Sequence, residues 1–285
     1  MTLLTLDMGG TFIKYGFWKE ETLQNVNKFP TPSTLAHFKK AIKAIIKSSN
    51  ENIQGLAISA PGVVDQEAGM IKGISAIPYI HGFKICEDFE KSFSLPVYIE
   101  NDANCAGICE MTYGVGKSSQ NVAFVVIGTG VGGSLFINGE LYKGTHNFAG
   151  EFGLIETKDG PLSYSASIVK ASNRYNELTN EQIDGEELFE RKAKGDELAN
   201  ELIKSFYDNL SEFMYNLQVT LNLDLVSIGG GVSAQKEISE VLENRLKSQL
   251  TKNNLGAFMP SIKTNQFANN ANLIGAATIF IKRKV

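Results

Sequence analysis

Cysteine, histidine and tryptophan are scarce in this chain, and it has no excess of positive charge. Its 285 residues include three cysteines, three histidines and one tryptophan, and the formal net charge is −4. The cysteines, Cys86, Cys105 and Cys109, are odd in number and form no CxxC pair, which argues against a disulfide framework. Cys105 and Cys109 would lie one helical turn apart and could attract a metal. No histidine cluster accompanies them, so we expect reduced, packed thiols.

Long apolar runs and an excess of basic residues are also missing. No apolar stretch approaches the roughly 20 residues of a membrane span, and the start of the chain lacks the basic region and cleavage site of a signal peptide. Lysines and acidic residues alternate, which gives no electrostatic case for nucleic acid. We expect a cytoplasmic protein without a membrane or nucleic-acid partner. The apolar fraction of 43% is ample for packed cores, and the length favours two domains.

The stretch LLTLDMGGTFIK, residues 3–14, reads as a short buried strand, a glycine turn and a second strand. The residues of interest in it are Asp7, Gly9, Gly10, Thr11 and Lys14. Backbone without Cβ lets an anion approach the amide N–H groups, while the Thr11 hydroxyl and the Lys14 cation add to the attraction. Asp7 could hold a hydrated Mg²⁺ beside the same phosphates. The stretch predicts a phosphate site, with an ordinary Asp-Gly hairpin as the alternative.

A second glycine-rich turn, GTGVGG at 128–133, follows an apolar run over 121–127. It satisfies the dinucleotide pattern GxGxxG, but such a turn should open a helix. Here an alternating strand with an Asn-Gly hairpin turn follows over 134–142, which disfavours a nicotinamide oxidoreductase. The order of strand, glycine turn and hairpin therefore occurs twice. We interpret it as a duplicated phosphate-gripping hairpin, with a nucleotide in the cleft between two halves.

Two further apolar runs end in polar or turn residues. The run over 53–59 leads into Ala60-Pro61-Gly62, which is either a simple turn or the lining of a cleft. The strand predicted over 95–99 ends at Glu100-Asn101-Asp102, directly before a helix predicted over 103–111. Catalytic residues of α/β folds lie at such strand ends. Asp102 could serve as a base or as a helix N-cap, and the two roles are not exclusive.

The remaining pattern is that of an α/β chain in two parts. Helical spacing predicts helices over 34–49, 84–93, 184–194, 197–222, 234–250 and 271–281. A buried strand over 225–228 ends in three glycines, where a flat ring or a phosphate could approach the backbone. The small, polar connector at 114–119 is a plausible boundary. We expect a small lobe of residues 1–117 with 271–285, and a large lobe of residues 118–270.

With these residues assembled, the chain resembles the ROK family of bacterial sugar kinases, within the actin, hexokinase and Hsp70 superfamily. Seven motifs carry the resemblance in the family's order: DMGGTFIK (7–14), APGVVD (60–65), LPVYIENDANCA (95–106), IGTGVGGSLFINGELYKG (127–144), AGEFG (149–153), IGGGVS (228–233) and ANLIGAA (271–277). The resemblance implies a two-lobed, duplicated α/β fold of the actin/hexokinase (ribonuclease H-like) type with an interdomain cleft. It also suggests a homodimer.

The resemblance further implies an ATP- and Mg²⁺-dependent kinase that phosphorylates a sugar 6-hydroxyl. Asp102 would be the general base for that hydroxyl, and Asn101, Glu151 and Gly62 would join it in the sugar site. Residues from both glycine turns and from the third glycine run would bind ATP: Gly9, Gly10, Thr11, Lys14, Thr129, Gly130, Val131 and Gly132 at the phosphates, and Gly230 and Gly231 near the adenosine. Asp7 would lie near Mg²⁺, through water.

The chain departs from the family pattern after Gly153. Many members carry a histidine there and a CxCGxxGCxE zinc motif shortly downstream. Here the histidine position is Leu154, and residues 155–172 contain no cysteine or histidine, so we expect no zinc. The departure argues against a glucokinase-like sugar site and makes the chain similar to bacterial β-glucoside kinases and some N-acetylmannosamine kinases.

Two non-enzymatic alternatives remain. A ROK transcriptional regulator would carry a helix-turn-helix before the first strand, which begins here at Leu3. A sugar sensor without activity would need no base, whereas Asp102 is present.

Overall fold

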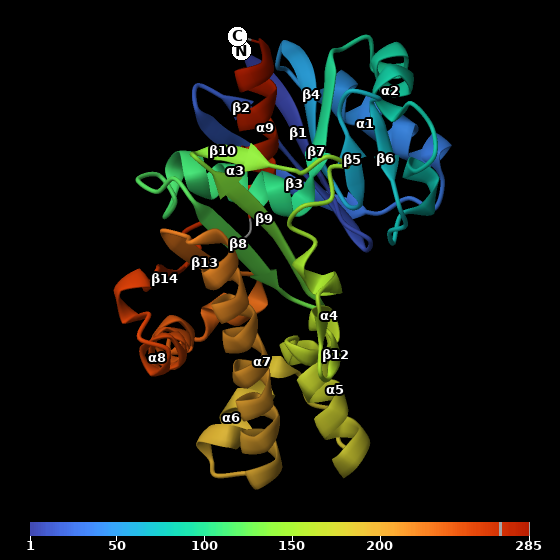
Figure 1. The fold of residues 1–285 in the computed structure, drawn as a ribbon. Coiled ribbons are helices and arrows are strands. Elements are labelled where there is room, and N and C mark those ends of the chain that lie inside the picture. Colours follow the sequence, from blue (N-terminus) through green and yellow to red (C-terminus); the bar gives the residue numbers. More distant parts are fainter. Residues whose placement is uncertain (268–269, 285) are drawn as a thin grey trace. The chain divides into compact units, whose positions relative to one another are not determined.

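The chain forms two compact units of mixed α/β structure (Figure 1). The computed structural model describes residues 1–267 and 270–284. Unit 1 comprises Met1–Thr112, Gly144–Phe148 and Asn269–Val285, and unit 2 comprises Tyr113–Lys143 and Ala149–Ala268. The predicted α/β class is confirmed, while the lobe boundaries expected from the sequence stay a prediction.

Unit 1 is built on a five-stranded sheet of order β3-β2-β1-β4-β7. Its strands are β1 (Thr2–Met8), β2 (Phe12–Lys19), β3 (Thr22–Pro30), β4 (Ile53–Ala60) and β7 (Val97–Asn101). The strands β1, β4 and β7 run parallel, and β2 is antiparallel to β1. The other elements are α1 (Leu35–Ser48), the hairpin β5 (Val63–Asp65) and β6 (Met70–Lys72), the 3₁₀ turn η1 (Pro78–Ile80), α2 (Ile85–Phe93), α3 (Asp102–Tyr113) and α9 (Ala271–Lys284).

Unit 2 repeats the same sheet plan, with the order β10-β9-β8-β13-β14. Its strands are β8 (Val122–Ile127), β9 (Val131–Ile137), β10 (Glu140–Tyr142), β13 (Leu225–Gly229) and β14 (Ser261–Thr264), with a small hairpin of β11 (Glu156–Thr157) and β12 (Gly160–Pro161). Its helices are η2 (Phe152–Leu154), α4 (Leu162–Ser165), α5 (Ile168–Thr179), α6 (Gly185–Ala193), α7 (Glu197–Leu221), η3 (Gly231–Ala234), α8 (Ile238–Lys252) and η4 (Gly256–Phe258).

Successive side chains of a strand point to opposite faces of the sheet, so each face needs a cover of its own. Different helices cover the two faces of the first sheet. Leu4, Leu6, Leu56 and Ile58 belong to one apolar core with residues of α1 and α2. The helix α9, red in Figure 1, packs against β1 and β4. Gly55 makes room there, since a Cβ at that position would overlap the ring of Phe280.

A glycine also lets α9 approach α3 very closely. A Cβ added to Gly275 would overlap the backbone carbonyl oxygen of Cys105. Cys105 and Cys109 are free thiols buried in α3, and burial raises the pKa of each well above its usual range. The metal-ligand alternative for these cysteines finds no support within the described residues, which bring no third ligand beside them.

Several local expectations need correction. The helix expected from Ala234 begins at Ile238, because residues 231–234 form the 3₁₀ turn η3. The strand β3 has a polar, largely exposed sequence without clear alternation, which is why the pattern did not reveal it. The segment after Gly153 holds α4 and α5, whose serines weaken the helical signal.

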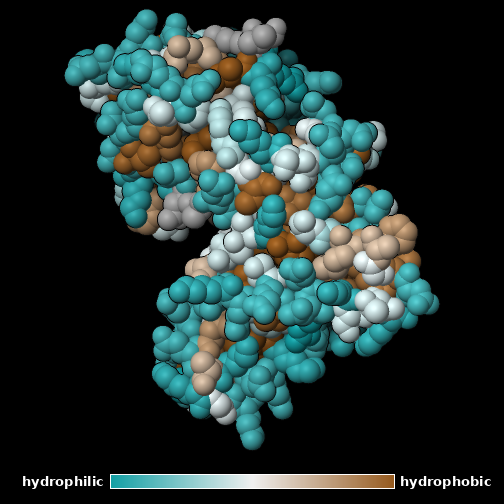
Figure 2. All heavy atoms as spheres, turned by 90° about the vertical axis from the view of Figure 1, so that its left-hand side faces the viewer, coloured by the Kyte–Doolittle hydropathy of each residue, from teal (hydrophilic) through white to brown (hydrophobic). Residues whose placement is uncertain are grey.

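No helix in the described part of the chain is long and apolar enough to span a membrane. On the face drawn in Figure 2, hydrophilic residues cover most of each unit, and hydrophobic residues show between them in separate groups.

Candidate functional site

Asp7 lies near the carboxyl end of β1, where residues from three elements of unit 1 meet. Its Oδ1 accepts hydrogen bonds from Ser59 Oγ at 3.1 Å and from Asn272 Nδ2 at 3.0 Å. Within the described residues no hydrogen bond falls on Oδ2. The carboxylate is therefore oriented through one oxygen and can offer the other to a hydrated cation.

This donor set fits Mg²⁺ held through water. Magnesium prefers oxygen ligands and usually keeps several of its waters, so one or two carboxylates suffice beside substrate phosphates. The described residues bring together no group of three or more histidine, cysteine or carboxylate side chains that could hold a metal by themselves. In the pairing of β1 with β2, Lys14 lies directly opposite Asp7.

The first glycine turn, residues 9–11, is held by its own backbone and by Thr31. The Gly9 N–H donates to the carbonyl oxygens of Asp7 at 3.2 Å and Phe12 at 3.1 Å. Thr31 Oγ1 donates to the Gly9 carbonyl at 2.6 Å, and the Thr31 N–H donates to the Thr11 carbonyl at 3.0 Å. The N–H groups of Gly10 and Thr11 donate no hydrogen bond to any acceptor in the described part of the chain.

Thr31 is a functional candidate that sequence reasoning missed. It follows a Pro at the end of an irregular polar strand, and no motif marks it.

The first glycine turn needs glycine at positions 9 and 10. A Cβ on Gly9 would lie 2.6 Å from the Phe12 carbonyl oxygen, and a Cβ on Gly10 would lie 2.7 Å from the Ala76 side chain.

Asn101 joins the end of β7 to the start of α3 and to the loop at Gly62. Its Oδ1 accepts from the Asn104 N–H at 3.0 Å, which caps the helix, and its Nδ2 donates to the Gly62 carbonyl at 3.0 Å. The capping role that the sequence left open for Asp102 thus belongs to its neighbour. Asp102 is the first residue of α3, and its Oδ1 accepts from the Ala103 N–H at 2.8 Å.

A carboxylate at the junction of a strand end and a helix start is placed where α/β folds hold catalytic groups, and it can accept a proton from a hydroxyl group. Asp102, Asn101 and Gly62 lie at the carboxyl ends of β7 and β4, the same edge of the sheet as Asp7 and the first glycine turn.

Glu100 is a second residue that the motif did not single out. Its carboxylate is fully buried, and its Oε1 accepts from the Asn101 N–H at 2.8 Å and from Asn104 Nδ2 at 3.0 Å. Its Oε2 accepts from Gln66 Nε2, and Gln66 in turn accepts from Arg283 Nη2 at 2.7 Å. A buried carboxylate needs such donors, so Glu100 fixes the backbone that carries Asn101 and Asp102.

In unit 2 the second glycine turn joins β8 to β9, and Glu151 lies in the segment packed against β9. Thr129 and Gly130 are in the turn, Val131 begins β9, and Gly132 pairs with Val126 of β8. Glu151 follows Gly150, whose φ of +95° requires glycine. Burial raises the pKa of the Glu151 carboxyl above its usual value.

A cavity of about 620 Å³ opens beside the third glycine run of unit 2. Gly231 and Val232 line one side, Ile168 and Val169 of α5 and Phe189 of α6 line another, and the other lining residues are Asp184, Gly185, Glu186, Ala234, Gln235, Lys236 and Glu237. Its volume and its lining of both apolar and polar residues are typical of small-ligand sites.

Gly230 brings the glycine run against β8. It has a φ of +83°, and a Cβ there would overlap the Ile127 backbone, so the ends of β13 and β8 approach closely. Gly230 itself is not among the residues that line the cavity.

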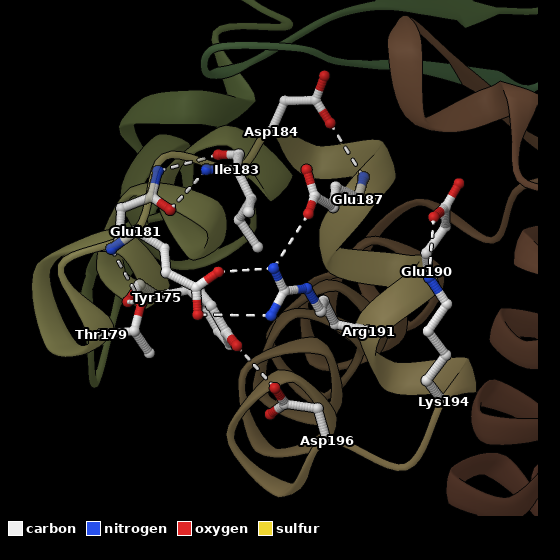
Figure 3. A network of polar contacts seen from close by, with 11 residues as sticks. Tyr175, Thr179, Glu181, Ile183, Asp184, Glu187, Glu190, Arg191, Lys194 and Asp196 are labelled. Carbon is white, nitrogen blue, oxygen red and sulfur yellow. Dashed lines mark hydrogen bonds and ion pairs between the residues drawn. The ribbon is translucent and has the colours of Figure 1, made fainter.

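A network of ion pairs and hydrogen bonds connects the helices around this cavity (Figure 3). Arg191 of α6 contacts Glu181 at 2.6 Å and Glu187 at 3.1 Å, and Tyr175 of α5 donates to Asp196 at 2.6 Å. Figure 3 shows the Arg191 guanidinium pointing between the two glutamates. The network ties α5, α6 and the start of α7 together and so supports the α5 and α6 walls of the cavity.

The sequence-predicted residues therefore gather in each unit. In unit 1 the structure brings together Asp7, Gly9, Gly10, Thr11, Lys14, Gly62, Asn101 and Asp102 at one edge of the sheet. In unit 2, Thr129, Gly130, Val131 and Gly132 form the turn and the strand that follows it, with Glu151 packed nearby and Gly231 at the cavity.

Comparisons with known proteins show what this chain is similar to. The model of the ROK family matches residues 3–283. A β-glucoside kinase from Listeria monocytogenes is 31% identical over 301 residues, covering 100% of this chain and 99% of that protein. An N-acetylmannosamine kinase from Vibrio vulnificus is 33% identical over 253 residues, covering 81% and 83%. A ROK family glucokinase from Streptomyces griseus, solved with glucose and AMPPNP, is 25% identical with a TM-score of 0.78, covering 98% and 99%.

Proposed function

The chain belongs to the ROK family, and from this membership we propose that it is a kinase that transfers the γ-phosphoryl group of ATP to the 6-hydroxyl of a sugar. The observation that carries the proposal is the placement of Asp102 as the first residue of α3, held at a sheet edge by Asn101 and Glu100. The expected actin/hexokinase-like class agrees with the likeness to a sugar kinase structure.

In the proposed reaction, Asp102 accepts the proton of the sugar hydroxyl as its oxygen attacks the γ-phosphorus. The bond between that phosphorus and the bridging oxygen of ADP breaks, so the products are a sugar phosphate, ADP and a proton. Positioning and charge neutralisation dominate phosphoryl transfer, and a general base contributes about 10²- to 10⁴-fold. Asn101, Gly62 and Glu151 bind and orient the sugar hydroxyls in this proposal.

ATP is bound by the glycine turns and by the cavity of unit 2. The N–H groups of the turn at Gly9–Thr11 and of the turn around Gly130 are suited to phosphate oxygens, with Thr11 and Lys14 adding a hydroxyl and a cation. The adenosine occupies the 620 Å³ cavity near Gly231. Asp7 would hold Mg²⁺ through water, and the ion would supply charge neutralisation at the phosphates.

For the sugar, we propose a β-glucoside or another hexose, with N-acetylmannosamine as the competing substrate. The two curated relatives named for these activities support both choices. The segment 155–172 has no cysteine or histidine, in keeping with a zinc-free sugar site. We further propose a homodimer that acts in the cytoplasm, where ATP is available.

The test is sugar-dependent ADP release measured across glucose, fructose, N-acetylglucosamine, N-acetylmannosamine, cellobiose and gentiobiose. Asp102→Asn should lower kcat by about 10²- to 10⁴-fold, without loss of nucleotide binding. Asp65→Asn is the matched control, since Asp65 lies in β5 and pairs with Lys72 at 2.8 Å. Wild type that binds sugar but releases no ADP would favour a sugar-sensing protein instead, and full activity in Asp102→Asn would reject the proposed base.

A further inference from the structure

The segment in which the zinc motif is missing holds the second glycine turn through two serines. Ser163 of α4 accepts a hydrogen bond from the Val131 N–H at 3.0 Å and donates to the Val131 carbonyl at 3.2 Å. Ser167 donates to the carbonyl oxygens of Gly128 at 2.9 Å and Thr129 at 3.2 Å. Four backbone groups of the turn are thus bound by two hydroxyl groups from one short segment.

Both serines are closely enclosed. Ser167 is buried, and as the N-cap of α5 its oxygen also accepts from the Lys170 N–H at 3.4 Å. A Cβ on Gly153 would overlap both Ser163 Oγ and the Val131 carbonyl oxygen, and one on Gly130 would lie 3.0 Å from Ser163 Oγ. The glycines on either side leave just enough space for the Ser163 hydroxyl, so its contact with Val131 is built into the packing.

The consequence of these bonds is that the carbonyl groups of the turn are occupied. The Gly130 carbonyl is occupied as well, because the Gly128 N–H donates to it at 2.9 Å. No hydrogen bond of the described chain involves the N–H groups of Thr129 and Gly130. With the carbonyl oxygens held by hydroxyls, these two donors remain for an anion, which is the arrangement of a backbone anion site.

The first glycine turn shows the same arrangement with a different residue. Thr31 Oγ1 donates to the Gly9 carbonyl at 2.6 Å, and the N–H groups of Gly10 and Thr11 donate no hydrogen bond to the described residues. In both turns a hydroxyl from outside the motif binds a carbonyl oxygen of the turn. The hydroxyl groups come from unrelated segments in the two units, Thr31 after β3 and the two serines at α4 and α5. What the two turns share is therefore the arrangement itself.

We propose that Ser163 and Ser167, with Thr31 in the other unit, are positioning residues that orient the turn N–H groups toward the phosphates of the nucleotide. The proposal rests on the proposed function, because it takes the turns as the phosphate sites. It assigns the segment after Gly153 a role in nucleotide binding that needs no metal.

The experiment is isothermal titration of the full-length protein with AMPPNP in the presence of Mg²⁺, and in parallel with adenosine. Ser163→Ala, Ser167→Ala and Thr31→Val should each weaken AMPPNP binding by about 3- to 10-fold, the loss of one or two net hydrogen bonds. Adenosine binding should stay within about twofold of wild type, because neither Ser163 nor Ser167 lines the cavity near Gly231, although Ile168, which follows Ser167, does. Ser167→Thr, which keeps the hydroxyl, should restore AMPPNP affinity.

Two controls separate positioning from general damage. Ser172→Ala removes a buried hydroxyl of α5 that donates to the Val169 carbonyl at 3.0 Å, and Thr34→Ala removes the N-cap of α1. Both should bind AMPPNP as wild type does. Unchanged AMPPNP affinity in the serine variants, or an equal loss for adenosine and AMPPNP, would overturn the positioning role. A wild type that binds AMPPNP yet shows no sugar-dependent ADP release would count against the proposed function alone.

Discussion

Asn272 donates a hydrogen bond to Asp7 Oδ1 at 3.0 Å, although 265 positions separate the two residues in the chain. Ser59 binds the same oxygen from β4. Three segments far apart in the sequence thus determine how one carboxylate is oriented, and α9 takes part in the site as well as in the packing of unit 1.

Asn272→Ala should weaken Mg²⁺-dependent activity. Loss of a residue that orients a metal-binding side chain typically costs about 10- to 100-fold in metal affinity or activity. We expect a higher half-saturating Mg²⁺ concentration, measured by ADP release at saturating ATP and sugar. Thr278→Val is the matched control, because it removes a hydroxyl that donates to the Ile274 carbonyl within the same helix and touches no site residue. An unchanged Mg²⁺ dependence in Asn272→Ala would remove Asp7 from the proposed metal site.

Asn101→Asp should keep one of the two hydrogen bonds of the Asn101 side chain and remove the other. The aspartate can still accept from the Asn104 N–H, so the helix cap persists, but it cannot donate to the Gly62 carbonyl. We expect the free energy of unfolding to change little and KM for the sugar to rise by about tenfold or more. Asn101→Ala should lose both, with an added cost of about 0.5–2 kcal/mol for the cap. Chemical denaturation and steady-state kinetics measure the two effects. Equal sugar KM in Asn101→Asp and wild type would contradict the role of the Gly62 contact.

Glu151→Gln should stabilise the protein at neutral pH while impairing sugar binding. Burial raises the pKa of this carboxyl in the folded state, so its ionised form is less favourable in the folded protein than in the unfolded chain. That penalty is present above the raised pKa and disappears as the pH falls through it, when the folded protein takes up the proton first.

The stability difference between Glu151→Gln and wild type should therefore be largest near pH 8 and shrink toward acid pH, as followed by thermal melting. KM for the sugar should rise by about 10- to 100-fold, the loss of a hydrogen bond to a charged group. Glu156→Gln, an exposed carboxylate in β11, serves as the control. A stability difference that grows as the pH falls would be incompatible with a raised pKa.

Gly275→Ala should destabilise the protein, because its new Cβ would overlap the Cys105 carbonyl and push α9 away from α3. Overpacking of this kind typically costs about 1–3 kcal/mol. The measurement is the urea midpoint at an unchanged slope. Gly256→Ala is the comparison, since its Cβ would lie 3.4 Å from Thr251 Oγ1, an ordinary contact. Matching midpoints for the two variants would show that α9 can shift without cost.

The strand ends and turns that carry the candidate site could be predicted from the sequence because their signals are local. Gly9 and Gly10 follow a short apolar strand, and Asp102 follows another, so the strand ends revealed where the polar residues gather. The duplicated sheet was visible for the same reason: each half begins with a strand, a glycine turn and a hairpin.

The supporting residues could not be predicted in this way. Thr31, Ser163 and Ser167 act through single hydroxyl groups on backbone carbonyls many positions away, and serine and threonine are too common in loops to carry a signal. Asn272 reaches Asp7 only because α9 packs on β1, a long-range contact that no local pattern encodes. The role of Glu100 depends on burial, which a run of polar residues at a strand end does not suggest.

The close packing of α9 on β1 and β4 also affects how the protein folds during its synthesis. Residues 1–112 leave the ribosome first, yet the helix that covers one face of their sheet follows only after unit 2 has been made. At about 5–20 residues per second, that interval lasts on the order of ten seconds or more. During this interval the face of the first sheet around Gly55 lacks α9 and is exposed. Unit 2 can therefore fold before unit 1 is complete.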